Sequence, residues 1–94
     1  MSTATGSEPT TLRALRCLKQ GAIPLEAVQA RIGVTARVAR YAILRLRNAG
    51  YARRVDRVEY ELTAAGVKLL RTPGAAKAWA VAADHRHEAK HEDV

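Results

Sequence analysis

Three glycines, Gly21, Gly33 and Gly50, divide the chain into short segments, and this division constrains the fold more than any other feature. Before Gly50, apolar residues recur at the three- and four-residue spacing of amphipathic helices. Over residues 51–62, apolar and polar residues alternate, as they do in half-buried β-strands. The chain has 94 residues, which is enough for one small domain built of short elements. The pattern predicts a mainly α domain with a small β-hairpin (α+β).

Leucine spacing and the glycines that follow predict the first two helices. The first helix covers residues 10–20 and is closed by Gly21. After an extended connector at residues 22–24, the second helix covers residues 25–32. Gly33 then provides the left-handed residue that a tight turn between two helices requires.

The third helix is the most informative segment of the chain. Thr35 serves as its N-cap, and the helix ends at Asn48 or Ala49. One side is a narrow apolar stripe suited to close packing, formed by Ala39, Ala42, Ile43 and Leu46. The opposite side mixes positive charge, an aromatic ring, an amide and a leucine: Arg37, Arg40, Tyr41, Leu44 and Asn48, flanked by Arg45 and Arg47. A purely solvated surface has no need of this mixture, so the outer side is a candidate binding surface.

A short hairpin follows the third helix and concentrates positive charge. Residues 51–55 and 58–62 predict two strands, joined by a tight turn at residues 56–57. Its three arginines are Arg53, Arg54 and Arg57. Thr63 then caps a fourth helix over residues 64–71, which we expect to bury Val67 and Leu70.

The C-terminal segment predicts a helix over residues 74–83 and a polar, frayed tail from Asp84. Trp79 lies among small residues, Ala75, Ala78 and Ala82. Trp79 either packs back onto the domain, whose core is short of aromatic residues, or forms a homodimer contact through residues 74–83. Of these two readings we favour the homodimer.

The excess of positive over negative charge lies in the chain before residue 72. Residues 1–50 hold eight basic and two acidic side chains, residues 51–71 hold five and three, and residues 72–94 hold three and four, giving +6, +2 and −1. We therefore divide the chain into a disordered N-terminus (1–8), a domain (9–71) and a C-terminal helix and tail (72–94). Arginine-rich composition suits phosphate and base recognition, but a GC-rich genome also enriches Arg and Ala.

Several classes of protein are excluded by composition. No stretch approaches the roughly 20 apolar residues of a membrane span, and the first eight residues lack the regions of a signal peptide. A single cysteine, Cys17, cannot form an intrachain disulfide, which favours a reducing, cytoplasmic setting. We read Cys17 as a small buried apolar residue.

Three runs carry a family resemblance: LEAVQARIGVT at residues 25–35, LRNAGYARR at 46–54 and YELTAAG at 60–66. The last two resemble the L-x-x-x-G-[YL] and Y-x-L-T-x-x-G signatures of bacterial MarR-, PadR- and related regulators. The resemblance implies a winged helix-turn-helix domain over residues 10–71, with a three-helix core, a wing and a C-terminal helix.

The resemblance also implies a function. Winged helix-turn-helix regulators read the major groove of double-stranded DNA with the third helix and contact phosphates or the minor groove with the hairpin. The base-facing residues would be Thr35, Arg37, Arg40, Tyr41, Leu44 and Asn48. The phosphate and wing contacts would be Arg45, Arg47, Arg53, Arg54 and Arg57. We expect a sequence-specific transcriptional regulator, acting as a repressor, without catalysis or a cofactor.

Other readings stay open at this point. Small winged helices also occur as nucleic-acid-binding modules in phage or plasmid replication and partition, and as modules for protein–protein contact. The run from His87 to His91 matches H-E-x-x-H, the zinc motif of metalloproteases. It lies in a polar segment at the chain end, with only His85 and Asp84 nearby, so we assign no metal site there.

Overall fold

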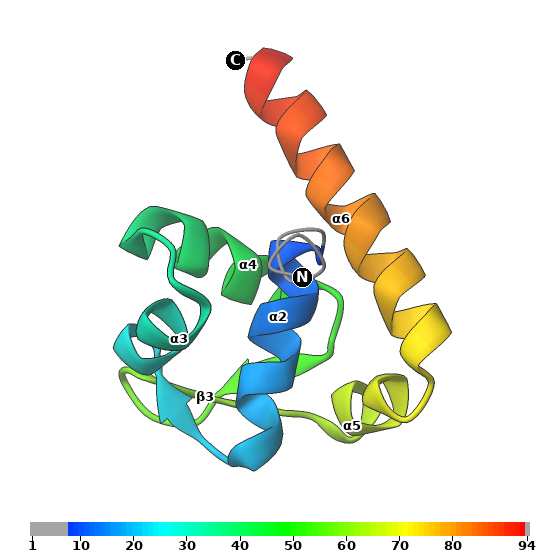
Figure 1. Ribbon diagram of the computed structural model, residues 1–94. Coiled ribbons are helices and arrows are strands. Elements are labelled where there is room, and N and C mark those ends of the chain that lie inside the picture. Colours follow the sequence, from blue (N-terminus) through cyan, green and yellow to red (C-terminus); the bar gives the residue numbers. More distant parts are fainter. Residues whose placement is uncertain (1–7, 94) are drawn as a thin grey trace.

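The computed structural model describes the backbone of residues 8–93 and the side chains of residues 8–85 (Figure 1). Its helices are α2 (Thr10–Cys17), the 3₁₀ turn η1 (Leu18–Gln20), α3 (Leu25–Ile32), α4 (Ala36–Asn48), α5 (Ala64–Leu70) and α6 (Pro73–Asp93). Its strands are β1 (Ile23–Pro24), β2 (Ala52–Arg54) and β3 (Glu59–Leu62). This is the predicted α+β class: mostly helical, with a small antiparallel sheet.

The helix ends follow the predicted local signals. Gly33 ends α3 in the left-handed conformation, with φ of 69° and ψ of 42°. The Thr35 hydroxyl caps α4 by accepting a hydrogen bond from the Val38 amide at 3.2 Å. Gly21 has a φ of 123° where η1 ends. Gly33 and the cap Thr35 thus make α3 and α4 consecutive helices joined by a short turn.

The sheet has one strand more than the sequence pattern predicts. The connector after Gly21 is an edge strand: Ile23 pairs with Tyr60 and Pro24 with Glu59, in the strand order β1-β3-β2. An edge strand tolerates Pro24, because its missing N–H faces no neighbouring strand. The pairing fastens the start of α3 to the hairpin.

The hairpin itself is shorter than predicted. Ala52 pairs with Leu62 and Arg54 with Tyr60, and the Val55 amide still donates to the Glu59 carbonyl at 2.9 Å. The connection is therefore a three-residue loop over residues 56–58 rather than a two-residue turn at 56–57. Val58 belongs to this loop and is exposed.

The core forms around α2, which Figure 1 shows crossing the middle of the molecule. Aliphatic residues from α2, η1, α3, α4, α6 and β2 fill it: Leu12, Ala14, Leu15, Leu18, Val28, Ile32, Ala42, Ile43, Leu46, Ala52, Ala76 and Ala80. Cys17 is half-buried against this core, and burial raises the pKa of its thiol. The predicted role of Cys17 as a small apolar packing residue agrees with this position.

Helix α5 differs from the prediction in the side that it turns inward. Of the two residues expected inside, Leu70 is half-buried against the core, as is Leu69, whereas Val67 is exposed. Gly66 is buried because α5 passes close to the backbone of Tyr51. A Cβ at this position would collide with the carbonyl oxygen of Tyr51. This contact explains physically why glycine stands three residues after the cap Thr63.

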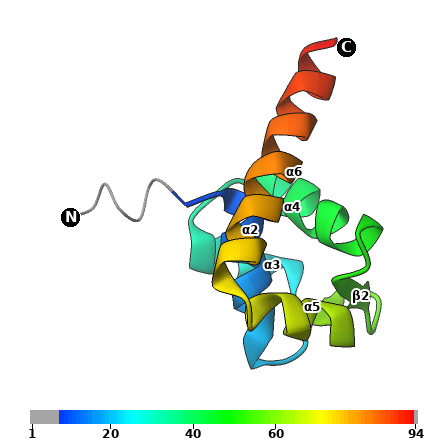
Figure 2. The same ribbon diagram turned by 90° about the vertical axis from the view of Figure 1, so that its right-hand side faces the viewer.

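Helix α6 is longer than predicted, and the alanines that it buries are not the three named with Trp79 above. It starts at Pro73 and continues to Asp93 as one helix, where a frayed tail was expected from Asp84. Figure 2 shows α6 packed against α2 in its first half and extending past the body of the molecule in its second. Its buried side consists of Ala76, Ala80 and Ala83, with Trp79 half-buried beside them, whereas Ala75, Ala78 and Ala82 are exposed.

Trp79 packs back onto the domain. Its ring meets that of Tyr51 edge to face, with centroids 4.8 Å apart and an interplanar angle of 83°. The contact joins α6 to the residue that precedes β2. Of the two readings of Trp79, the structure therefore supports the intramolecular one. In the part of the chain that the structure describes, no helix combines the length and apolar character needed to cross a bilayer.

Candidate nucleic-acid interface

Helix α4 presents one side to the core and the other to solvent, as its spacing predicts. The predicted apolar stripe is buried: Ala39, Ala42, Ile43 and Leu46 are each exposed by 2% or less. The 13 residues of α4 follow the side-chain cap Thr35 and end at Asn48. The helix that carries the outer side chains is thus packed against the core along most of the length of α4.

Five of the six predicted base-facing residues share the outer side of α4 or its cap in exposed positions. These are Thr35, Arg37, Arg40, Leu44 and Asn48. The sixth, Tyr41, is half-buried, and the Arg37 guanidinium lies over its ring, 5.8 Å from the centroid. The Thr35 hydroxyl already accepts the Val38 amide, which leaves its O–H as a donor and one further lone pair as an acceptor.

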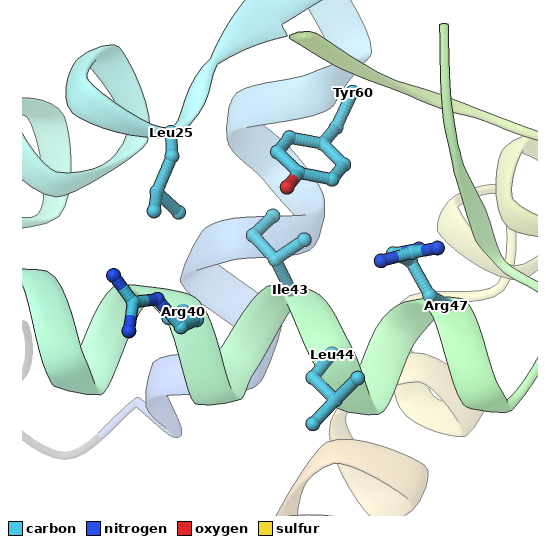
Figure 3. A pocket seen from close by; sticks show the side chains of 6 residues that line it. All are labelled: Leu25, Arg40, Ile43, Leu44, Arg47 and Tyr60. Carbon is cyan, nitrogen blue, oxygen red and sulfur yellow. The ribbon is translucent and has the colours of Figure 1, made fainter. Parts of the chain in front are cut away.

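A shallow groove runs along α4 on the side that faces the start of α3 and strand β3. Figure 3 shows Arg40 and Arg47 towards its two ends, with Ile43 between them, Leu25 and Tyr60 across from the helix and Leu44 on the lower side of α4. The lining residues are Leu25, Arg40, Ile43, Leu44, Arg47 and Tyr60. The Arg47 guanidinium lies over the Tyr60 ring, 5.9 Å from its centroid, so the groove joins α4 to the hairpin.

Sequence reasoning missed Leu25 and Tyr60 as parts of this surface. Neither residue was assigned to a binding surface, and both pack against the core while lining the groove. The signal that could have found them is the β1–β3 pairing, which places the start of α3 next to Tyr60. A two-residue strand carries too little periodicity to be predicted.

Arg45 stands apart from the surface on which it was predicted. Its side chain is only 16% exposed and its Nη2 lies 3.0 Å from Oδ1 of Asp84 on α6. Its Nε donates to the Thr11 hydroxyl at 2.9 Å. The side chain of Arg45 is thus turned between α2 and α6, away from the outer side of α4.

The hairpin arginines fall into two groups. Arg53 is paired with Glu61 across the strands, with Nε and Nη2 at 2.6 and 2.5 Å from Oε2. Arg54 and Arg57 are exposed and make no ion pair with any side chain of residues 8–85. The hairpin therefore offers two uncommitted guanidinium groups, and Val55 and Val58 are exposed beside them.

No metal centre is visible in the described region: among side chains 8–85, no three His, Cys, Asp or Glu residues gather to hold an ion. His85 is exposed and Asp84 is engaged with Thr11 and Arg45. The side chains of His87, Glu88 and His91, the H-E-x-x-H match, lie outside the described residues.

Comparison with known proteins supports the fold. No family model matches the sequence, and no curated protein matches it. Among solved structures, the chain is similar to Rv1404 from Mycobacterium tuberculosis, with a TM-score of 0.66 and 19% identity, over 86% of this chain and 60% of that one. It is also similar to ligand-free NadR, with a TM-score of 0.64 and 22% identity, over 96% of this chain and 65% of that one.

The chain thus spans less than two thirds of the length of either protein. Both have a winged-helix fold, with helices and a small antiparallel sheet in the same arrangement. At such identities the likeness concerns the fold alone, and the predicted relation to MarR- and PadR-type regulators stays a prediction. The fold of this chain is a winged helix-turn-helix, with α3 and α4 as the helix pair and β2–β3 as the wing.

Proposed function

We propose that this chain is a sequence-specific, double-stranded DNA-binding transcriptional regulator without catalytic activity. The observation that carries the proposal is the outer side of α4, where arginine, leucine and amide side chains are exposed on a helix whose opposite side is buried. Both similar structures are winged-helix transcription regulators, which supports a regulator at the level of the fold. Because one fold can host several functions, the proposal rests on the exposed side chains of α4 rather than on the fold.

In this proposal α4 enters the major groove, which is wide enough to admit an α-helix. Arg37 and Arg40 donate bidentate hydrogen bonds to O6 and N7 of guanine, and Leu44 contacts a thymine methyl group. Asn48, one turn further along, can pair with adenine. The buried stripe of α4 supports this role, because base discrimination requires side chains that start from a fixed backbone.

The wing supplies contacts to the DNA backbone. Arg54 and Arg57 are exposed and uncommitted within the described residues, so they are free to meet phosphates or the adjacent minor groove. Arg47, at the end of the groove beside Tyr60, lies between α4 and the wing and serves a phosphate there. Arg53, held by Glu61, contributes less.

The chain acts as a repressor and as a homodimer in this proposal. The Trp79 ring packs against Tyr51, so in this proposal the homodimer contact uses the other side of residues 74–83. The exposed residues there are Ala75, Ala78, Val81 and Ala82. Two copies paired by a two-fold axis present two α4 helices to half-sites about one helical turn apart.

The decisive experiment is selection of bound sites from random duplex DNA, followed by binding measurements on the selected site and on random DNA. A palindromic site is expected. Affinity should fall steeply between about 50 and 200 mM salt, because several phosphates are neutralised on binding. Absence of salt-dependent duplex binding would overturn the proposal and favour a winged helix that binds protein.

Three arginine variants test the assignment of roles. Arg40→Ala should weaken binding to the selected site by about 1–3 kcal/mol and relax the preference at one base pair. Arg54→Ala should weaken the selected and random DNA alike. Arg71→Ala is a matched control, since Arg71 is an exposed arginine at the end of α5 and belongs to neither α4 nor the hairpin. Equal losses on both DNAs for Arg40→Ala and Arg54→Ala would contradict the assignment.

A further inference from the structure

A cluster of three side chains joins three helices at a point that the DNA surface does not use. Asp84 of α6 lies against Thr11 of α2 and Arg45 of α4. The Thr11 hydroxyl donates to Oδ1 of Asp84 and accepts from Nε of Arg45 at 2.9 Å. Oδ1 of Asp84 also lies 3.0 Å from Nη2 of Arg45. Each member of the cluster therefore contacts the other two.

The same carboxylate also serves the start of α2. The residue before that helix is Pro9, which gives no side-chain cap, and the Thr11 amide donates instead to Oδ2 of Asp84 at 3.4 Å. An acidic group near a helix N-terminus satisfies backbone amides that have no partner inside the helix. Asp84 thus replaces the missing cap from 73 residues away along the chain.

The cluster is largely removed from solvent. Thr11 is fully buried, and the side chains of Arg45 and Asp84 are 16% and 21% exposed. Nη1 of Arg45 is buried and has no hydrogen-bond partner among the described residues. A buried guanidinium that loses its carboxylate leaves an uncompensated charge, so Arg45 and Asp84 depend on each other.

Resting on the proposed DNA-binding function, we propose that Arg45 and Asp84 are positioning residues: their ion pair fixes α4 against α2 and α6, so that an acidic residue supports DNA binding. Arg45 then stabilises the position of α4 within the molecule and makes no phosphate contact. The pair acts through the placement of Arg37, Arg40 and Leu44, which lie on the outer side of the same helix.

A positioning role predicts a change in DNA affinity opposite in sign to the change that net charge alone predicts. Asp84→Asn raises the formal net charge of +7 by one, which by charge alone strengthens binding to DNA. As a positioning residue, Asp84→Asn instead weakens binding to the selected site by about tenfold. Glu26→Gln is the matched control, because Glu26 is exposed on α3 and the same charge is removed without breaking the cluster. Its affinity should equal or exceed that of the wild type.

Arg45→Gln and the double variant Arg45→Gln/Asp84→Asn complete a cycle. Arg45→Gln should weaken binding to the selected site without changing the slope of affinity against salt, whereas loss of a phosphate contact lowers that slope by about one. The double variant should bind more tightly than either single variant, because neither a lone guanidinium nor a lone carboxylate stays buried. The double variant also decides the matter if Arg45→Gln alone does not fold.

Trp79 provides a readout of α6 that does not need DNA. It is the chain's single tryptophan, half-buried on α6 against Tyr51, so its fluorescence reports whether α6 remains docked. Asp84→Asn with wild-type Trp79 emission and weakened binding supports positioning rather than loss of the fold. If Asp84→Asn binds the selected site as tightly as Glu26→Gln does, the inference is overturned while the proposed function stands. A lowered salt slope for Arg45→Gln has the same consequence. A wild type that binds no duplex would overturn the proposed function with it.

Discussion

The two arginine-rich elements, α4 and the β2–β3 hairpin, differ in how firmly the rest of the molecule holds them. Helix α4 has a side-chain cap, Thr35, and a stripe of four residues that are buried in the core. In the two strands of the hairpin only Ala52 is buried, and the valines near its tip, Val55 and Val58, are 48% and 59% exposed. The same residue type, arginine, is thus presented on a fixed support in one element and on a loosely packed one in the other.

The difference matches what each proposed contact requires. A bidentate hydrogen bond to a base edge depends on position and angle, so the supporting backbone must be held in place. Attraction to a phosphate falls off gradually with distance and has little dependence on angle. The proposed division of labour, with bases read by α4 and phosphates met by the wing, therefore follows from packing as well as from the identity of the side chains.

The largest expected effect comes from removing the support of α4. Leu46→Ala deletes a side chain that is fully buried in the core, and we expect the free energy of unfolding to fall by about 3 kcal/mol. Urea unfolding followed by circular dichroism measures the change. Val58→Ala is the counterpart in the hairpin, with an expected change within about 0.5 kcal/mol because Val58 is exposed. Similar losses in both variants would contradict the comparison.

The next effect concerns the base of the hairpin. Gly66→Ala forces a Cβ into the Tyr51 carbonyl, and Leu62 Cδ2 would lie only 3.1 Å away, so β2 and α5 must move apart. We expect a loss of about 2 kcal/mol in the free energy of unfolding, measured by thermal or urea denaturation. Gly74→Ala is the control, because a Cβ at Gly74 meets open space in α6 and alanine favours a helix. A Gly66→Ala variant as stable as the control would show that the contact relaxes at no cost.

The features that the sequence predicted are those set by neighbours along the chain. The stripe of α4 follows from its spacing, and the ends of α3 and α4 follow from Gly33 and Thr35, whose chemistry acts within three or four residues. The outer side of α4 follows directly, because it is what the stripe leaves exposed. The candidate surface on α4 was for this reason predictable residue by residue, apart from Tyr41 and Arg45.

The features that the sequence missed depend on partners far away. Arg45 lies at the edge of the outer side, and its inward direction is determined by Asp84, 39 positions along the chain from it. Val67 was assigned to the core because it fits a helical spacing, but the position of Gly66 against Tyr51 turns a different side of α5 inward. Periodicity shows that a helix has two sides and does not show which contacts each side will find.

A smaller effect is expected at the cap of α4. Thr35→Ala removes the acceptor of the Val38 amide and should lower the free energy of unfolding by about 1 kcal/mol. Thr35→Ser keeps a hydroxyl in the same place and should retain most of that stability. Denaturation curves of the two variants separate the cap from a base contact. If Thr35→Ser is as unstable as Thr35→Ala, the methyl group matters and the capping hydrogen bond does not.

The smallest effect on stability is expected in the hairpin, at the Arg53–Glu61 pair. The two side chains are 67% and 29% exposed, so Glu61→Gln should change the free energy of unfolding by less than about 0.5 kcal/mol. The same substitution releases Arg53, so binding to random and selected DNA should strengthen together, with a salt slope steeper by about one. Arg53→Ala/Glu61→Gln is the control and should lose this gain. A gain confined to the selected site would show that the wing reads sequence, and the division between a fixed helix for bases and a loose hairpin for phosphates would fail.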